Sequence, residues 1–217
     1  MKDKELIKKV AETVKERLEG EGSGHDWWHI YRVWKMAQYI AKEESANILV
    51  VELSALLHDI ADWKFTDGDD TVGPRVAGEI LAKHNVPEDV IKHVQENMQE
   101  GSFKGAGVPA VPSSLEGKVM QDADRLDAIG AMGIARTFAY GGHKNRIIYD
   151  PNVKPTMHQS KEEYAKNNSS TVNHFYEKLL LLKDLMNTES ARRIAECRHK
   201  FMEQYLDRFY KEWEGEL

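Results

Sequence analysis

The segment ILVVELSALLHDIA, residues 48–61, is apolar on nearly every side when it is written as a helix. A helix of that kind is stable only when other helices cover it. We therefore expect a helix from about residue 47 to residue 60 at the centre of a helical core. His58 and Asp59 are adjacent and lie near the end of this segment. Two titratable side chains are therefore expected at the end of a core helix.

The rest of the chain follows the same helical spacing. Apolar residues recur every three or four positions, and no segment alternates between apolar and polar residues as a strand does. The pattern predicts one all-α domain over residues 1–217, a bundle of roughly seven to ten helices. Asp26, Ser114 and Thr188 are the expected N-caps. A long helix is predicted over residues 115–140, and further helices are predicted over 170–186 and 188–214. Residues 141–168 are predicted to form a polar surface excursion that could serve as a lid.

Composition excludes several classes of protein. A hydrophobic content of 41% over 217 residues is enough to build a core. The net charge of −6 leaves no basic excess for a nucleic acid polymer. No apolar run is long enough to span a bilayer, and the start, MKDKELIKKVAETVKERL, is amphipathic, so we expect a cytoplasmic protein without membrane partners. The single Cys197 can form no internal disulfide.

Four polar residues fall on or beside predicted buried helix faces: His29, His58, Asp59 and Asp124. Such side chains are costly in a core unless they are paired or bind a metal. If their three helices converge, two imidazoles and two carboxylates meet at one point. This donor set suits one divalent ion of manganese, iron, cobalt, nickel or zinc, with magnesium as a further candidate. A metal of this kind activates water and neutralises phosphoryl charge, which predicts hydrolysis of a phosphorylated substrate.

The stretches HDWWHIYRV, LLHDIAD and DADRLDA, in this order, resemble the HD-domain superfamily of metal-dependent phosphohydrolases. The resemblance implies an all-α fold and assigns the metal ligands to His29, His58, Asp59 and Asp124. It covers residues 25–135 as the core, and the C-terminal helical extension, about residues 160–215, is similar to that of small stand-alone bacterial members. Such members act on nucleotides, and some are nucleoside triphosphate pyrophosphohydrolases.

Further residues are candidates for catalysis and substrate binding. Asp62 follows Asp59 by three positions, so it would share a helical face with it and could manage the proton of the attacking water. His84 and His93 lie where two-metal members carry extra histidines, but a single metal is preferred, with His93 facing the substrate. His25 precedes His29 by one turn, yet the pair lacks the glutamate base of a zinc protease. The expected substrate-binding residues are His25, Lys64, His93, Asp127, Lys144 and Arg146.

The favoured function is therefore hydrolysis of nucleoside triphosphates with release of pyrophosphate. A nucleotidase and an alarmone or cyclic-nucleotide phosphodiesterase are alternatives within the same class. From another class, a nonhydrolytic nucleotide sensor could use the same pocket. A helical scaffold without a site is a third alternative, but it would require the full donor set to arise by coincidence. The aromatic stretches FYEKLL and EQYLDRFYKEW could face a second copy in a homodimer or pack within the monomer.

Overall fold

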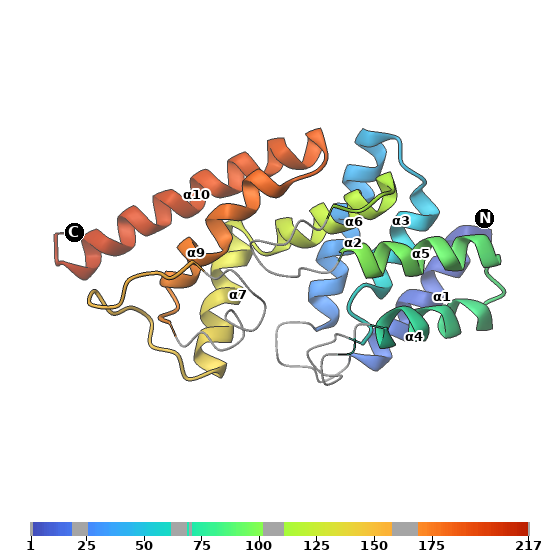
Figure 1. Ribbon diagram of the computed structural model, residues 1–217, viewed down its shortest axis with the longest axis horizontal. Coiled ribbons are helices and arrows are strands. Elements are labelled where there is room, and N and C mark those ends of the chain that lie inside the picture. The colour runs from blue at the N-terminus through green and yellow to red at the C-terminus, as the bar shows by residue number, and fades with distance from the viewer. Residues whose placement is uncertain are drawn as a thin grey trace. The chain divides into compact units, whose positions relative to one another are not determined.

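The computed structural model describes residues 2–18, 26–61, 69, 71–101, 111–157 and 169–216. All elements in these ranges are helices and none is a strand, which confirms the all-α prediction (Figure 1). None of these helices is both long enough and apolar enough to cross a membrane. The elements are α1 (Lys2–Arg17), α2 (Trp27–Glu44), α3 (Ile48–Leu57), α4 (Val72–Lys83), α5 (Glu88–Gly101), α6 (Leu115–Asp127), α7 (Gly130–His143), α9 (Asn173–Glu177), the 3₁₀ helix η2 (Leu179–Leu185) and α10 (Glu189–Trp213).

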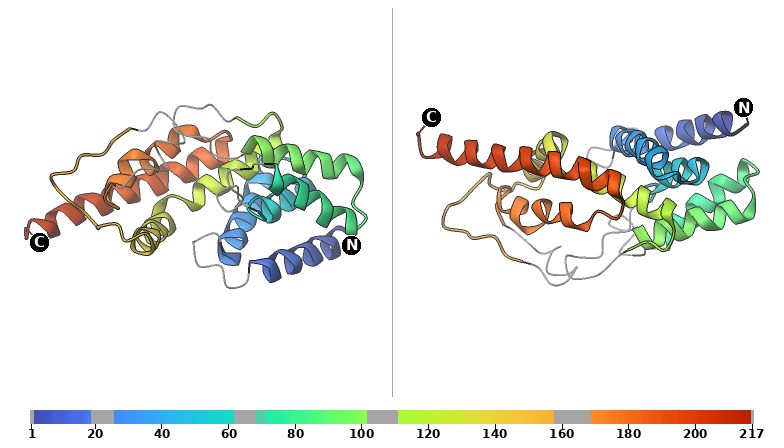
Figure 2. Two further views of the ribbon diagram at one scale, coloured as in Figure 1. Left: turned by 60° about the horizontal axis from the view of Figure 1, so that its bottom comes forward. Right: turned by 90° about the horizontal axis from the view of Figure 1, so that it is seen from above.

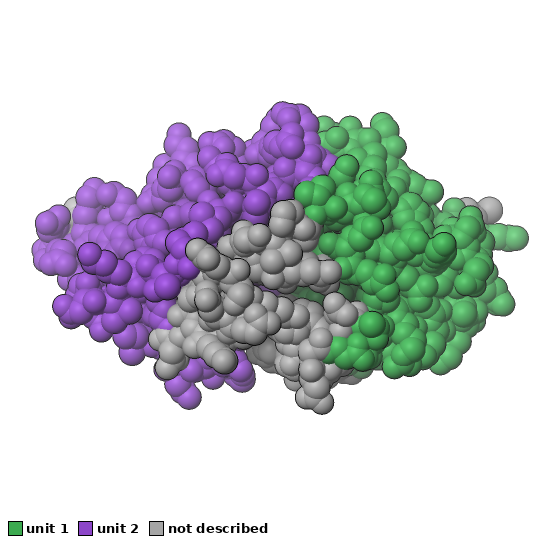
Figure 3. All heavy atoms as spheres, in the orientation of Figure 1, with its two compact units in different colours: residues 1–103, 109–124 green, residues 104–108, 125–217 purple. Residues whose placement is uncertain are grey.

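The chain divides into two compact units (Figure 3). Unit 1 contains residues 1–103 and 109–124, and unit 2 contains residues 104–108 and 125–217. The organisation as one domain over residues 1–217 stays a prediction.

Unit 1 is built around α3, as its sequence indicates. Helices α1, α2 and α5 each pack against α3, and α4 packs against α5. The α3 residues from Val50 to Leu57 are buried apart from Glu52, since neighbouring helices cover the helix on nearly every side. The N-cap of α3 is Asn47, whose side chain accepts hydrogen bonds from the backbone N–H groups of Leu49 and Val50.

Unit 2 is organised along α10, the longest helix of the described residues. Helix α7 packs against α10, and η2 contacts both α9 and α10 (Figure 2). The N-cap of α10 is Thr188, as predicted, and its side chain accepts a hydrogen bond from the Ala191 N–H. The predicted helix over residues 170–186 is instead two short elements, α9 and η2, because the backbone at Lys178 leaves helical geometry (φ −144°).

The predicted long helix over residues 115–140 is wrong in one respect, because it is broken into α6 and α7. Ile129 is extended, and Gly130 has φ +73°, a conformation that residues with a Cβ rarely adopt. A Cβ at Gly133 would lie 2.2 Å from the Ala128 carbonyl oxygen, so glycine is also needed where the two helices meet. The break changes the helical phase, so Met132, which the apolar spacing of an unbroken helix would place on the buried side, is 41% exposed.

Candidate metal centre

His29 enters the site from the first turn of α2. The Asp26 carboxylate caps this helix by accepting a hydrogen bond from the His29 N–H at 2.9 Å, as the sequence predicts. The His29 side chain lies on the buried face of α2, together with Val33, Ala37 and Ile40, and it is fully buried. The residue that caps the helix thus also fixes the backbone of a candidate ligand.

His58 and Asp59 lie in the turn that directly follows α3, because the helix ends at Leu57 with His58 as its C-cap. The His58 Nδ1 lies 2.9 Å from the carbonyl oxygen of Ala55. A carbonyl oxygen can only accept a hydrogen bond, so Nδ1 carries the proton and the neutral ring presents the lone pair of Nε2 to the site. The backbone of α3 therefore selects the tautomer that a metal ligand requires.

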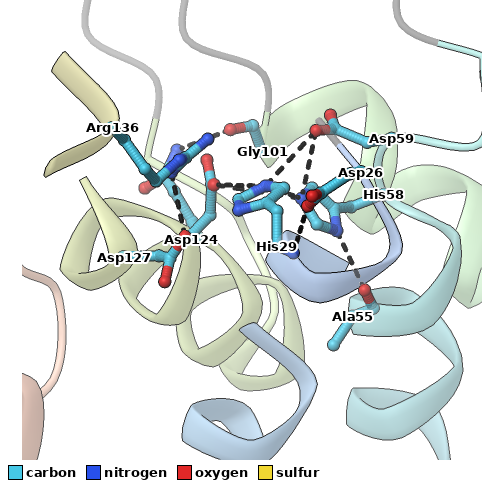
Figure 4. Close-up of polar contacts among 10 residues, drawn as sticks. Asp26, His29, Ala55, His58, Asp59, Gly101, Asp124, Asp127 and Arg136 are labelled. Atoms are coloured by element: carbon cyan, nitrogen blue, oxygen red, sulfur yellow. Dashed lines mark hydrogen bonds and ion pairs between the residues drawn. The ribbon is translucent and has the colours of Figure 1, made fainter. Parts of the chain in front are cut away.

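Asp124 comes from the last turn of α6 and points toward the two histidines (Figure 4). Its side chain is 44% exposed, whereas those of His29, His58 and Asp59 are 1%, 7% and 17% exposed. One side of the donor group is thus closed by the core, and the Asp124 side is accessible to water or a ligand.

Both carboxylates lie close to both histidine rings. The Nε2 atoms of His29 and His58 are 3.2 Å apart, and His29 Nε2 lies 3.4 Å from Asp59 Oδ2 and 3.5 Å from Asp124 Oδ1. From His58 Nε2 the same two carboxylate oxygens are at 3.6 and 3.9 Å.

Four of these five separations fit a shared divalent ion, and the fifth, 3.9 Å between His58 Nε2 and Asp124 Oδ1, is longer. An ion about 2.0–2.2 Å from each donor would place the donors about 2.8–3.6 Å apart. With neutral imidazoles the group carries two negative charges, which a divalent cation would balance where the core limits hydration. His29, His58 and Asp59 could hold a metal ion on the proximity of their ligand atoms alone. Asp124 is not part of that group, but its Oδ1 lies 3.5 Å from His29 Nε2.

The HD domain family matches residues 27–129, a range that contains all four of these side chains. The Bacillus subtilis protein YpgQ is 39% identical to this chain, over 99% of the chain and 97% of YpgQ. The chain belongs to the HD domain family.

Solved structures of the HD domain family cover nearly the whole chain. A HD-superfamily hydrolase from Bacillus thuringiensis is 44% identical, with a TM-score of 0.78 over 98% of each chain. A protein from Lactobacillus plantarum is 36% identical, with a TM-score of 0.84 over 96% of this chain and 97% of its own. Bacillus subtilis YpgQ in complex with ADP has a TM-score of 0.78 and 36% identity over 98% of this chain and 97% of YpgQ. The fold is that of HD-superfamily hydrolases.

Four of the predicted substrate-binding residues lie in described parts of the chain. His93 Nε2 lies 3.6 Å from Glu116 Oε2, at the opposite end of α6 from Asp124. The Asp127 carboxylate is buried and accepts a hydrogen bond from Arg136 Nη1 at 2.9 Å. The side chains of Lys144 and Arg146 both lie over the ring of Tyr140. Their contact with a substrate stays a prediction.

Three predicted site residues lie outside the described residues: His25, Asp62 and Lys64. His84 is the C-cap of α4.

Hydrogen-bond partners that come from other segments of the chain were not predicted from the sequence. Neither Arg136 as the partner of Asp127 nor the Ala55 carbonyl as the partner of His58 was expected. Asn97 was not predicted to have a structural role, although its position in the sequence indicates one. It shares the buried face of α5 with Ile91, Val94 and Met98, and an amide in an apolar face indicates a specific hydrogen-bond partner.

Proposed function

We propose that this protein is a metal-dependent phosphohydrolase that acts on nucleotides in the cytoplasm, and that it cleaves nucleoside triphosphates to monophosphate and pyrophosphate. The observation that carries this proposal is the convergence of His29, His58, Asp59 and Asp124 within the HD domain fold. In this proposal the four side chains are ligands of one divalent ion, taken from manganese, iron, cobalt, nickel, zinc and magnesium. The bound ion supplies Lewis acidity, which makes water a nucleophile near neutral pH and offsets charge on a phosphoryl oxygen.

The chain's own residues have separate tasks in this reaction. The Ala55 carbonyl holds the His58 ring in the tautomer with a free Nε2. Asp62 accepts the proton of the attacking water. Water attacks the α-phosphorus, the bond between that phosphorus and the bridging oxygen breaks, and pyrophosphate leaves with the electron pair.

Substrate phosphates need positive charge, which a protein with a net charge of −6 must supply locally. Lys64, Lys144 and Arg146 are the proposed phosphate contacts, and His25, His93 and Asp127 are the proposed contacts to the rest of the nucleotide. The YpgQ complex with ADP supports a nucleotide as the ligand class, since the two proteins share their fold over nearly their full lengths.

The test is product analysis of metal-stripped full-length protein, resupplied with each ion in turn. The panel contains nucleoside mono-, di- and triphosphates, cyclic nucleotides and alarmones. The reaction is run in water enriched in oxygen-18, because the product that carries the label identifies the phosphorus attacked. We expect unlabelled pyrophosphate and labelled nucleoside monophosphate from a triphosphate. The Asp59→Ala variant is the control and should bind no metal and release no product.

Other outcomes identify the alternatives. Release of inorganic phosphate from monophosphates would indicate a nucleotidase, and turnover confined to alarmones or cyclic nucleotides would indicate a phosphodiesterase or alarmone hydrolase. Tight nucleotide binding with no turnover under any ion would contradict the enzyme and favour a nonhydrolytic sensor.

A further inference from the structure

A chain of buried and half-buried hydrogen bonds links helices α3, α5 and α6. Asn97 on α5 is 1% exposed, and its Nδ2 donates to Ser54 Oγ on α3 at 3.1 Å. The Ser114 hydroxyl donates to Asn97 Oδ1 at 2.6 Å and accepts from the Gly117 N–H at 2.9 Å. Asn97 thus connects α3 directly to the residue that caps α6.

Gly117 provides an independent observation that this contact is close. A Cβ at this position would lie 2.8 Å from Asn97 Oδ1 and 3.0 Å from Ser114 Oγ, closer than real Cβ atoms approach or at that limit. The start of α6 therefore approaches the Asn97 amide in a way that only glycine permits.

Two acidic side chains hold the same end of α6. Glu116 Oε1 accepts a hydrogen bond from the N–H of Asn47, the N-cap of α3, at 2.9 Å. Glu100, near the end of α5, accepts one from the Ser113 N–H at 2.7 Å. The position of α6 relative to α3 and α5 is therefore set at its N-terminus by several polar contacts.

The two helices that this chain connects both lead to the candidate metal centre. Ser54 lies one helical turn before His58, and Asp124 follows Ser114 by ten residues, about 15 Å along α6. A tilt of α6 by about 5° at its N-terminus would move Asp124 by about 1 Å over that length. A displacement of this size is sufficient to break a metal–ligand bond, whose length varies by only about 0.2 Å.

We propose that Ser54, Asn97 and Ser114 are positioning residues, which place the Asp124 carboxylate against His29 and His58. This inference rests on the metal-binding role of the site in the proposed function. It assigns the effect to Asp124 alone, because His29 is held by its own N-cap and His58 by the Ala55 carbonyl.

The test measures metal binding directly, by calorimetric titration of full-length protein with Mn²⁺ and by the visible spectrum of bound Co²⁺. We expect Asn97→Ala to weaken Mn²⁺ binding about tenfold, the lower end of the effect typical for residues that orient ligands. Its Co²⁺ spectrum should change toward that of Asp124→Ala. In the Asp124→Ala background, Asn97→Ala should cause no further loss of affinity, because the carboxylate through which it acts is gone.

Two further variants separate positioning from loss of fold stability. Ser114→Ala removes the donor to Asn97 from a half-buried site and should weaken Mn²⁺ binding in the same direction. Val10→Ala truncates a fully buried side chain on α1, which carries no candidate ligand, and should lower the melting temperature without changing the affinity for Mn²⁺.

The inference is overturned if Asn97→Ala and Ser114→Ala bind Mn²⁺ like the wild type, or if the loss is equally large in the Asp124→Ala background. An equal loss in Val10→Ala would also overturn it. Wild-type protein that binds no divalent ion would refute the metal centre and this inference together. If the ion binds and the variants behave as expected but no nucleotide is hydrolysed, only the proposed reaction fails.

Discussion

The Nε2 atoms of His29 and His58 lie 3.2 Å apart, although one residue lies in the first turn of α2 and the other follows α3. Two protonated imidazoles would repel each other at this distance. The approach of these two ring nitrogens, with Asp59 and Asp124 beside them, is the arrangement that a shared cation would occupy.

The first prediction concerns stability in the presence of metal. A divalent ion at 100 times its Kd should stabilise the protein by about 2.7 kcal/mol, a rise in melting temperature of about 5–11 °C for a chain of this size. His58→Ala should abolish the rise. The exposed His143, at the end of α7, provides the control, since His143→Ala should retain it. A rise that persists in His58→Ala would place the ion elsewhere.

The second prediction separates metal binding from proton transfer. Asp62→Asn should bind the ion with wild-type affinity and lower kcat by about 10²–10⁴-fold, the usual contribution of a general base. Asp69→Asn is a matched control, because Asp69 is an exposed acid between α3 and α4 whose carboxylate bonds Thr71. Steady-state kinetics with metal-loaded protein checks both variants, and an unchanged kcat in Asp62→Asn would remove that residue from the mechanism.

The third prediction concerns the break between α6 and α7. Gly133→Ala should destabilise the fold by about 1–3 kcal/mol, the usual cost of overpacking, because its Cβ would meet the Ala128 carbonyl oxygen at 2.2 Å. Gly142→Ala, in the same helix, has nothing within 4 Å of the added Cβ and should be neutral or stabilising by up to about 1 kcal/mol. Urea denaturation followed by circular dichroism measures both, and similar losses in the two variants would argue against the close approach at Gly133.

The fourth prediction is a pH dependence at Glu100. Hydrogen bonds from the Ser113 N–H and hydroxyl hold the pKa of the Glu100 carboxyl below its ordinary value of 4.5. Because the folded pKa is lowered, the stabilisation is present above pH 4.5 and is lost as the pH falls through the folded pKa. Glu100→Gln should thus cost about 0.5–1 kcal/mol at pH 7, a value reduced for solvent exposure. Denaturation at pH 7 and at acid pH compares the two proteins, and a cost that does not shrink in acid would contradict the assignment.

Local chemistry made much of this fold predictable. The caps at Asp26, Ser114 and Thr188 were predicted correctly. A short polar side chain just before a helix accepts a hydrogen bond from a backbone N–H group of the first turn, so its position in the sequence is sufficient to identify it. The buried character of α3 followed from its composition, since no polar face was available for solvent.

Other features depend on the backbone or on distant contacts. The apolar periodicity of residues 115–140 continues across Gly130, so its positive φ was invisible in the pattern. The same is true of partners: Asp127 bonds Arg136 across that break, and no spacing along a single helix predicts this pair. Asp124 was selected by its place beside the predicted buried face together with the resemblance, whereas Asp122, which is fully buried, was not predicted as a site residue.

The cap of α2 also bears on how fast a bound ion would leave. Helix ends open more readily than helix centres, and His29 lies in the first turn of its helix. Opening of that turn would withdraw one donor while the other three stay in place, which is an easier route to dissociation than breaking all the bonds at once. By accepting the His29 N–H, Asp26 closes this route, so a residue that need not touch the ion would lengthen its residence time.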